Sequence, residues 1–396
     1  MEIPACPRSF WPTLRGVCSA AASPALLLAC AVLGACAPLP GALAEALPRE
    51  APPSLPADAE VPPLLAAPDV PLPGPAPRQQ LAFVAGVGLA DDASCARCHD
   101  EIAAEWQSSL HRHAWQNDYF RRSYANETKA ICRGCHEPSA DPSAEPSLAA
   151  REVGVGCTTC HVATAGIVGS RPLPARPGGH VVLGDARLAT PAACGGCHDF
   201  PFPDDADGAG PRQQDTLGEH RRSAAAEKPC QGCHMPLAAS RAGGEHHDHT
   251  FRVQGDRAML ARAVRVTSAT LEDGKLTLSL APGEIGHAFP TGDVFRRAEV
   301  RVTPIDEAGA PLGPEVTQVL ARTFGHVQAP NGGLSRVVRA DTRIVDNRLL
   351  KLSLSPRARR ARFQIVWQRL PPDLAERLGM TPRDHETVVH EGTVSR

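Results

Sequence analysis

The chain has 396 residues, a formal net charge of -2, 14 cysteines and 39 prolines. The near-neutral charge argues against a protein that binds nucleic acid through a basic surface, because that class relies on net positive charge to contact phosphates. So many cysteines are unusual for a cytosolic enzyme, which leaves disulfides, metal ions or a covalently attached cofactor as their use.

The first segment, residues 1–35, has the pattern of an export signal. Two arginines precede an uncharged stretch whose most apolar part, residues 26–35, has the length of a secretory signal core and is too short to span a membrane. It ends at Cys36 in a Leu-Gly-Ala-Cys sequence that resembles the lipobox of bacterial lipoproteins. We therefore expect lipidation of Cys36, a membrane anchor, and a place on the outer membrane of a Gram-negative bacterium. Cleavage after Ala44 is the alternative and would release the protein into the periplasm.

The next segment, residues 36–79, is rich in proline, with 11 prolines between positions 48 and 77. Proline lacks the backbone donor that helices and sheets require, so such a segment favours an extended chain. We interpret it as a linker that holds the folded part away from the membrane.

The ten cysteines that follow Cys36 form five C-x-x-C pairs, and a histidine directly follows each pair. The five motifs are motif 1, Cys95, Cys98 and His99; motif 2, Cys132, Cys135 and His136; motif 3, Cys157, Cys160 and His161; motif 4, Cys194, Cys197 and His198; and motif 5, Cys230, Cys233 and His234.

C-x-x-C-H is the attachment signature of c-type haem. The two thiols can reach the two vinyl groups on one edge of a porphyrin, and the adjacent histidine can supply an axial nitrogen to the iron. Zinc is the competing interpretation of paired C-x-x-C motifs, but a zinc site has no need of a histidine after every second cysteine. The pattern therefore predicts five covalent haems, with all ten cysteines as attachment points and the five histidines as iron ligands.

The five motifs define a predicted pentahaem domain over residues 80–252. Its residues are too few to build a hydrophobic core around each cofactor, so we expect mostly irregular chain and short helices around stacked haems. The clearest predicted helix covers residues 100–115, where apolar side chains recur with helical spacing.

Residues 253–396 contain no cysteine and instead show period-two alternation of apolar residues. The Asp273-Gly274 pair between two such runs is a strong hairpin signal. Short strands over this length predict an antiparallel β-sandwich domain. The alternating runs are Val264 and Val266; Leu276, Leu278 and Leu280; Ala298, Val300 and Val302; Leu350, Leu352 and Leu354; and Phe363, Ile365 and Trp367.

The sixth iron ligand decides whether a haem passes electrons or binds a small molecule. Methionine is scarce, with 4 residues in the chain against 16 histidines. We therefore expect histidine on both faces of most or all haems, an arrangement that favours low potentials.

Several segments resemble the cytochrome c-554-like (c-552/4) multihaem family, whose relatives include hydroxylamine oxidoreductase and pentahaem nitrite reductase. The resemblance is specific for haem architecture and less so for reaction. The similar segments are residues 95–111, with W-x-x-S-x-H after motif 1; residues 155–161; residues 230–236; residues 249–251; and residues 286–292, with H-x-F-P-T-G, similar to multihaem proteins that carry a β domain.

The resemblance implies five distal ligands, one for each iron. They are His111, His180, His220, His249 and His287. The nearest substitutes are His113, His246 and His247.

The chain departs from the enzymatic relatives, because it has no C-x-x-C-K motif and only two tyrosines, Tyr119 and Tyr124. The leading hypothesis is an exported electron-transfer cytochrome that serves redox partner proteins and has no catalytic residue. The alternative is a reductase or oxidase of a small nitrogen or sulfur compound at one five-coordinate haem. A third hypothesis is a haem subunit whose β domain holds a larger complex together.

Overall fold

The computed structural model describes residues 72–74, 83–84, 88–89, 91–126, 128–141, 143–175, 179–202, 210–328 and 333–396. These residues all belong to one unit of the chain, residues 60–396. The predicted signal, Cys36 and most of the predicted linker lie outside the described residues and stay predictions. Within the described part, none of the helices has the length and apolar character needed to cross a bilayer.

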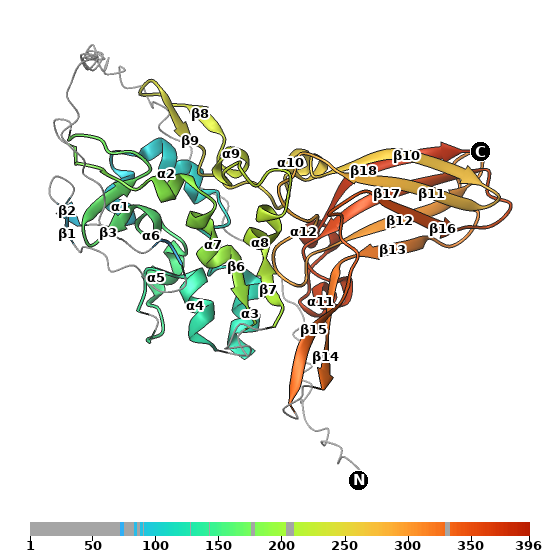
Figure 1. The fold of residues 1–396 in the computed structure, drawn as a ribbon, viewed down its shortest axis with the longest axis horizontal. Coiled ribbons are helices and arrows are strands. Elements are labelled where there is room, and N and C mark those ends of the chain that lie inside the picture. Colours follow the sequence, from blue (N-terminus) through green and yellow to red (C-terminus); the bar gives the residue numbers. More distant parts are fainter. Residues whose placement is uncertain are drawn as a thin grey trace, which may run out of the picture. The chain divides into compact units, whose positions relative to one another are not determined.

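The chain up to about residue 260 folds into short helices joined by turns (Figure 1). Five of these helices, α1, α4, α6, α7 and α9, contain part or all of a C-x-x-C-H motif. The helices are α1 Asp92–Ala96, α2 Asp100–Gln107, α3 Asp118–Asn126, α4 Ala130–His136, α5 Leu148–Val153, α6 Cys157–His161, α7 Ala192–His198, α8 Thr216–Arg221, α9 Gln231–His234 and α10 Arg257–Ala261, with a 3₁₀ helix at Ala186–Ala189. The predicted pattern of short helices is thus confirmed.

Small strands stand between these helices and form only two- and three-stranded ladders. They are β1 Phe83–Val84, β2 Gly88–Leu89, β3 Val162–Ala163, β4 Gly166–Gly169, β5 Leu183–Gly184, β6 Asp199–Pro201, β7 Arg212–Asp215, β8 Leu237–Ala239 and β9 Glu245–His247. Strands β3 and β6 begin directly after a motif histidine, and β8 begins shortly after one. Their ladders therefore hold the chain in place at the end of a C-x-x-C-H motif.

The helix predicted over residues 100–115 is shorter than expected and ends at Gln107. Residues 108–116 form turns, in which the Ser109 hydroxyl accepts a hydrogen bond from the Arg112 amide at 3.1 Å. The His111 carbonyl then accepts from the Val155 amide at 2.9 Å instead of extending the helix. Helical spacing in the sequence could not reveal this competing long-range bond.

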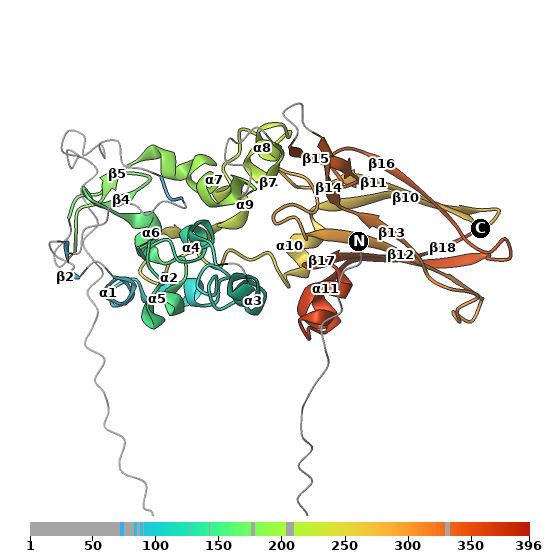
Figure 2. The ribbon, with the colours of Figure 1, turned by 90° about the horizontal axis from the view of Figure 1, so that it is seen from below.

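The chain from Val264 onward forms long antiparallel strands, as predicted. One sheet has the order β10-β11-β16 and a second has the order β13-β12-β17-β18, and Figure 2 shows them as two layers. The elements are β10 Val264–Glu272, β11 Lys275–Pro282, β12 Arg297–Ile305, β13 Val316–Leu320, β14 Arg322–Gln328, β15 Leu334–Asp341, β16 Arg348–Ser353, β17 Arg360–Gln368, α11 Pro372–Arg377, α12 Pro382–His385 and β18 Glu386–Ser395.

The predicted hairpin between β10 and β11 is present, with Glu272 paired to Lys275. Asp273 has φ 48° and Gly274 has φ 70°, so both central residues are left-handed, as a type I′ turn requires. A side chain at Gly274 would also meet the Pro356 backbone at 2.8 Å, so glycine is needed here for two reasons.

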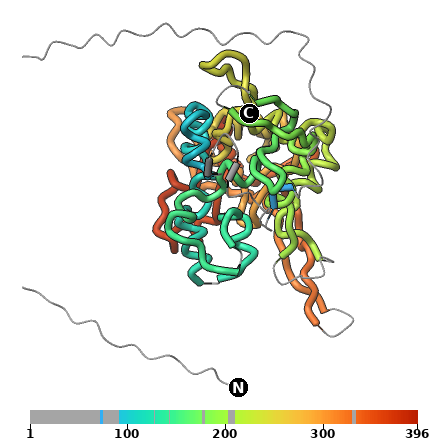
Figure 3. The backbone as a smooth tube through the Cα atoms, turned by 90° about the vertical axis from the view of Figure 1, so that its left-hand side faces the viewer, coloured from blue at the N-terminus to red at the C-terminus, as the bar shows by residue number. Residues whose placement is uncertain are grey.

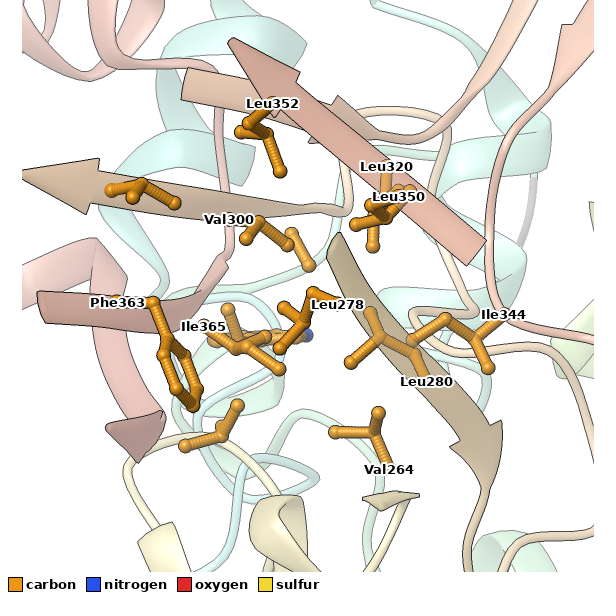
Figure 4. Packing of buried hydrophobic residues seen from close by; sticks show 14 of the residues in the cluster. Val264, Leu278, Leu280, Val300, Leu320, Ile344, Leu350, Leu352, Phe363 and Ile365 are labelled. Carbon is orange, nitrogen blue, oxygen red and sulfur yellow. The ribbon is translucent and has the colours of Figure 1, made fainter. Parts of the chain in front are cut away.

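The two sheets share one hydrophobic core (Figure 4). The alternating runs of the sequence supply it, because successive strand residues face opposite sides and every second one points inward. Fully buried side chains from different strands meet there, among them Leu278 of β11, Val300 of β12 and Ile365 of β17.

Strands β14 and β15 form a separate hairpin that extends from the sheets (Figures 1 and 3). An isolated hairpin needs additional packing to be stable. Phe202 provides it, with its ring 5.0 Å from that of Phe324 and 3.8 Å below the Arg336 guanidinium. The sequence analysis did not find this hairpin.

The helical segment contacts the β strands through buried polar side chains. Glu219 of α8 forms an ion pair with Arg343 at 2.7 Å, and both side chains are almost fully buried. The Glu219 carboxylate also accepts from the Thr291 hydroxyl at 2.6 Å. This group orders residues 286–292, the H-x-F-P-T-G segment.

Candidate functional site

The histidines of four motifs each face a second histidine from elsewhere in the chain. The ring centroids are 6.2 Å apart for His99 and His180, 6.3 Å for His198 and His111, 6.3 Å for His161 and His249, and 6.2 Å for His234 and His287. Four of the five predicted distal histidines therefore lie opposite a motif histidine.

These separations fit two imidazoles that share one metal ion. An imidazole nitrogen binds a metal at about 2.0–2.1 Å, and each ring centre lies roughly one ångström further out. Two such bonds on opposite sides of one ion place the ring centres roughly 6 Å apart. That four independent pairs repeat this spacing within 0.1 Å indicates a common group between the rings of each pair.

Hydrogen bonds leave the metal-facing nitrogen of these rings available. The Nδ1 atom lies 2.6 Å from a carbonyl oxygen in His249, 3.0 Å in His161 and 3.0 Å in His287. Donation from Nδ1 places the free lone pair on Nε2 and fixes the ring orientation.

Burial keeps several of the paired rings neutral, which is the form that binds metal, and two of them show the effect most clearly. It lowers the pKa of His111 to about 3, with His198 and His249 adding to the effect. It also lowers the pKa of His234 to about 4, assisted by His287.

The histidine of motif 2 differs from the other four. His136 Nδ1 lies 2.7 Å from the Ala114 carbonyl, and its ring stacks on Phe120 with centroids 3.6 Å apart. All 16 histidines lie within the described residues, and none of them makes a ring contact with His136 there.

His220, the fifth predicted distal ligand, lies elsewhere. It is buried on α8 with its Cδ2 atom 3.0 Å from where a side chain at Gly286 would begin, next to His287. Its Nδ1 atom has no hydrogen-bond partner among the described residues.

The substitutes His113, His246 and His247 do not face His136 either. His113 is bound to Gln116 at 3.2 Å, His246 to Glu105 at 2.8 Å and His247 to the Met235 carbonyl at 2.6 Å. The motif 2 site thus has a histidine on one face only among the described residues.

Comparison with known proteins adds to this geometry. Residues 94–162, which contain motifs 1 to 3, match the family model of cytochrome c554 and c-prime. The fold is similar to the crystal structure of a penta-heme cytochrome c552 from Thermochromatium tepidum, with a TM-score of 0.57 and 19% sequence identity over 76% of this chain and 97% of that chain. No curated protein matches the chain significantly.

The family match over residues 94–162 and the similar fold both indicate a multihaem c-type cytochrome. Its cofactor is c-type haem with iron, and the residues present fit that group: paired thiols next to a histidine, with a second imidazole at the right distance in four cases. Bound haem supplies reversible one-electron chemistry, and the protein supplies ligands, orientation and burial.

The motif thiols of the cytochrome lie close to those of neighbouring motifs. Three pairs of thiols lie close enough to shift each other's pKa: Cys95 and Cys157, Cys135 and Cys197, and Cys194 and Cys230. Motif 1 therefore lies beside motif 3, and motif 4 lies beside both motif 2 and motif 5.

Several residues that hold the cytochrome's ligands were not found from the sequence. Asp92 of α1 accepts hydrogen bonds from the amides of Cys157 and Thr158, which ties motif 3 to the chain before motif 1. Gly154 has φ 64°, and a side chain there would meet the His111 carbonyl at 2.6 Å. The sequence showed Gly154 shortly before motif 3, but its steric role depends on the distant turn at His111.

Proposed function

We propose that this cytochrome carries electrons between redox partner proteins through five covalently bound haems, one at each motif. The four facing histidine pairs carry the proposal, because a haem with two histidine ligands has no free position for a substrate and passes electrons only. Histidine on both faces also favours low potentials. The five haems of the Thermochromatium tepidum protein support the same number here.

The thiol contacts suggest an order for the electron path. The contacts between motifs 1 and 3, 2 and 4, and 4 and 5 give three neighbouring haem pairs. Cys160 of motif 3 also acts electrostatically on Cys194 of motif 4. We infer a path from the motif 1 haem through motif 3 to motif 4, with the haems of motifs 2 and 5 both next to motif 4.

A second candidate function is chemistry on a small molecule at the motif 2 haem. The observation that favours it is the absence of a histidine opposite His136 among the described residues, since a haem with one axial ligand can bind and transform a ligand on its other face. In this arrangement the other four haems supply or remove the electrons that the reaction needs.

Export and anchoring complete the proposal. The signal of residues 1–35 would take the chain to the compartment where haem is attached, and a lipid on Cys36 would hold it at a membrane. The proline-rich residues 36–79 would then separate the haem domain from that membrane.

The intact mass of the purified protein tests the haem number. It should exceed the mass of the processed polypeptide by five haems, and alkaline pyridine spectra should show thioether attachment. Zinc, or fewer than five haems per chain, would overturn the proposal. The double variant Cys132→Ser with Cys135→Ser should remove one haem and leave four.

Carbon monoxide tests the second candidate function. The reduced protein should bind it at one haem per chain, and loss of the motif 2 haem in the double cysteine variant should abolish that binding. If the reduced protein binds carbon monoxide rapidly at none of its haems, electron transfer remains the proposed function.

A further inference from the structure

Two neighbouring arginines, Arg296 and Arg369, have no carboxylate partner. Arg296 Nη1 donates to the Arg369 carbonyl at 2.6 Å, and its guanidinium lies 5.9 Å from the Trp367 ring. The Nε atom of Arg369 is buried without a hydrogen-bond partner. Neither side chain forms an ion pair with any described residue.

Two other arginines of the β segment, Arg343 and Arg301, are paired with carboxylates. Arg343 lies 2.7 Å from Glu219 and 2.7 Å from Asp341, and Arg301 lies 2.6 Å from Glu386. A buried guanidinium without an anion is costly, and a second one beside it adds repulsion. Burial and then Arg296 lower the pKa of Arg369 to about 10, which agrees with a missing negative charge.

Asp293 is the carboxylate that acts on the positive charges of Arg296 and Arg369. It acts electrostatically on both arginines, but its Oδ1 atom accepts a hydrogen bond from the Phe295 amide at 3.0 Å. Arg296 and Asp293 also line a small cleft, whose other charged lining residues are Arg322 and Arg343. Arg322 donates to the Gln213 carbonyl at 2.8 Å and has no carboxylate partner either. Among the arginines that line this cleft, Arg296 and Arg322 thus lack a carboxylate partner among the described residues, whereas Arg343 is paired with Glu219 and Asp341.

This arginine pair lies next to motif 2. Tyr119 packs edge-on against Phe295, with centroids 5.7 Å apart, and the following residue, Phe120, stacks on His136. Asp293 and Arg369 are both close enough to His136 to act on it electrostatically. Asp293, Phe295 and Arg369 thus lie near motif 2, whose histidine has no histidine opposite it among the described residues.

We propose that Arg296 and Arg369 together bind one anion, a carboxylate or a small oxyanion, beside the haem of motif 2. Two guanidinium groups suit this class of ligand, because each presents several donors in a plane that matches two oxygens. The anion has two possible sources, a propionate of the motif 2 haem or a dissolved oxyanion that reaches its iron. The inference rests on the proposal that motif 2 carries a haem.

Nitrite titration and potentiometry of the full-length protein test the proposal and separate the two sources. The variants are Arg296→Gln, Arg369→Gln and the charge-conserving Arg369→Lys, with the exposed Arg357→Gln as a matched control. If the anion is dissolved, each Gln variant should weaken nitrite binding, followed by the Soret band, by roughly tenfold or more, since charge-assisted hydrogen bonds are lost. If the anion is a propionate, each Gln variant should instead lower the midpoint potential of one haem, because a positive charge that stabilises the reduced state is removed.

Whichever of the two changes, the nitrite affinity or the midpoint potential of Arg369→Lys should lie between the values of the wild type and Arg369→Gln. Both quantities should be the same in Arg357→Gln as in the wild type. Unchanged nitrite affinity and unchanged potentials in both Gln variants would overturn the proposal. A wild-type mass without a haem at motif 2 would instead overturn the proposed function, so the two failures can be told apart. Because Arg369→Lys retains the charge, it keeps the test valid if a Gln variant does not fold.

Discussion

Single residues show where the sequence could and could not predict the site. His111, His180, His249 and His287 were nominated through family resemblance, and each has its ring centre 6.2 or 6.3 Å from that of a motif histidine. His220 was nominated with them but lies beside His287. Sequence spacing places a histidine along the chain, whereas a distal ligand depends on how distant segments fold together. The spacing between His220 and Cys230 therefore could not show which ring His220 would face.

The pairings lead to a prediction at His287. Replacing it with alanine in the oxidised protein should convert one low-spin haem to high-spin, because the haem of His234 would lose its second ligand while its thioethers and proximal histidine remain. Low-temperature EPR with spin quantitation measures this change.

His220→Ala is the matched control for that substitution. It removes a buried histidine from the same neighbourhood but not one that faces a motif histidine. A spin count that changes in His220→Ala and stays constant in His287→Ala would contradict the pairing.

The ion pair of Glu219 and Arg343 gives a prediction about stability. Glu219→Gln should lower the free energy of unfolding by about 2 kcal/mol, since it removes a charged partner from a buried arginine that keeps only Asp341. Urea unfolding followed by circular dichroism measures the loss.

The exposed Glu272→Gln provides the comparison for this variant, and we expect a change of no more than about 0.5 kcal/mol. Equal effects of the two substitutions would mean that the buried pair does not stabilise the contact between α8 and the strands.

Whole elements were predicted best where one face of a strand is buried. The alternating runs became β10, β11, β12, β16 and β17, and the Asp273-Gly274 signal became the turn between two of them. Strands β13, β14, β15 and β18 were not found. The burial of β14 and β15 does not alternate cleanly along the sequence. The helix after motif 1 was predicted too long. It ends at Gln107, where the amides of Ser108 and Ser109 bond to the carbonyls three residues earlier.

Strand β11 carries the prediction for the core. Leu278 is fully buried between the sheets, so Leu278→Ala should cost about 2–5 kcal/mol of unfolding free energy through lost burial and a residual cavity. Chemical unfolding followed by tryptophan fluorescence measures this loss, because Trp367 belongs to the same core.

Leu349→Ala is the matched change at an exposed leucine of β16, with 56% of its surface accessible, and should have little effect. The haem content of Leu278→Ala should equal that of the wild type, since thioether bonds attach the cofactor independently of this core. A similar loss of stability in both leucine variants would contradict the shared core.

The whole molecule combines a segment that carries the C-x-x-C-H motifs, antiparallel sheets and a proposed lipid anchor at Cys36. Cys36→Ala should move the protein from the membrane fraction to the soluble periplasmic fraction and leave the haem content unchanged, because the anchor acts separately from folding. Cell fractionation with haem staining measures the shift. An unsubstituted protein that is already soluble and begins at Glu45 would favour cleavage after Ala44 instead.

The central claim is that four haems have histidine on both faces and that the haem of His136 does not. The most direct test is a quantitative EPR spectrum of the oxidised wild-type protein whose five haems have been counted by mass. The account predicts four low-spin haems and one high-spin haem, and the high-spin signal should disappear when motif 2 is removed by Cys132→Ser with Cys135→Ser. Five low-spin haems, or a high-spin signal that survives the loss of motif 2, would contradict it.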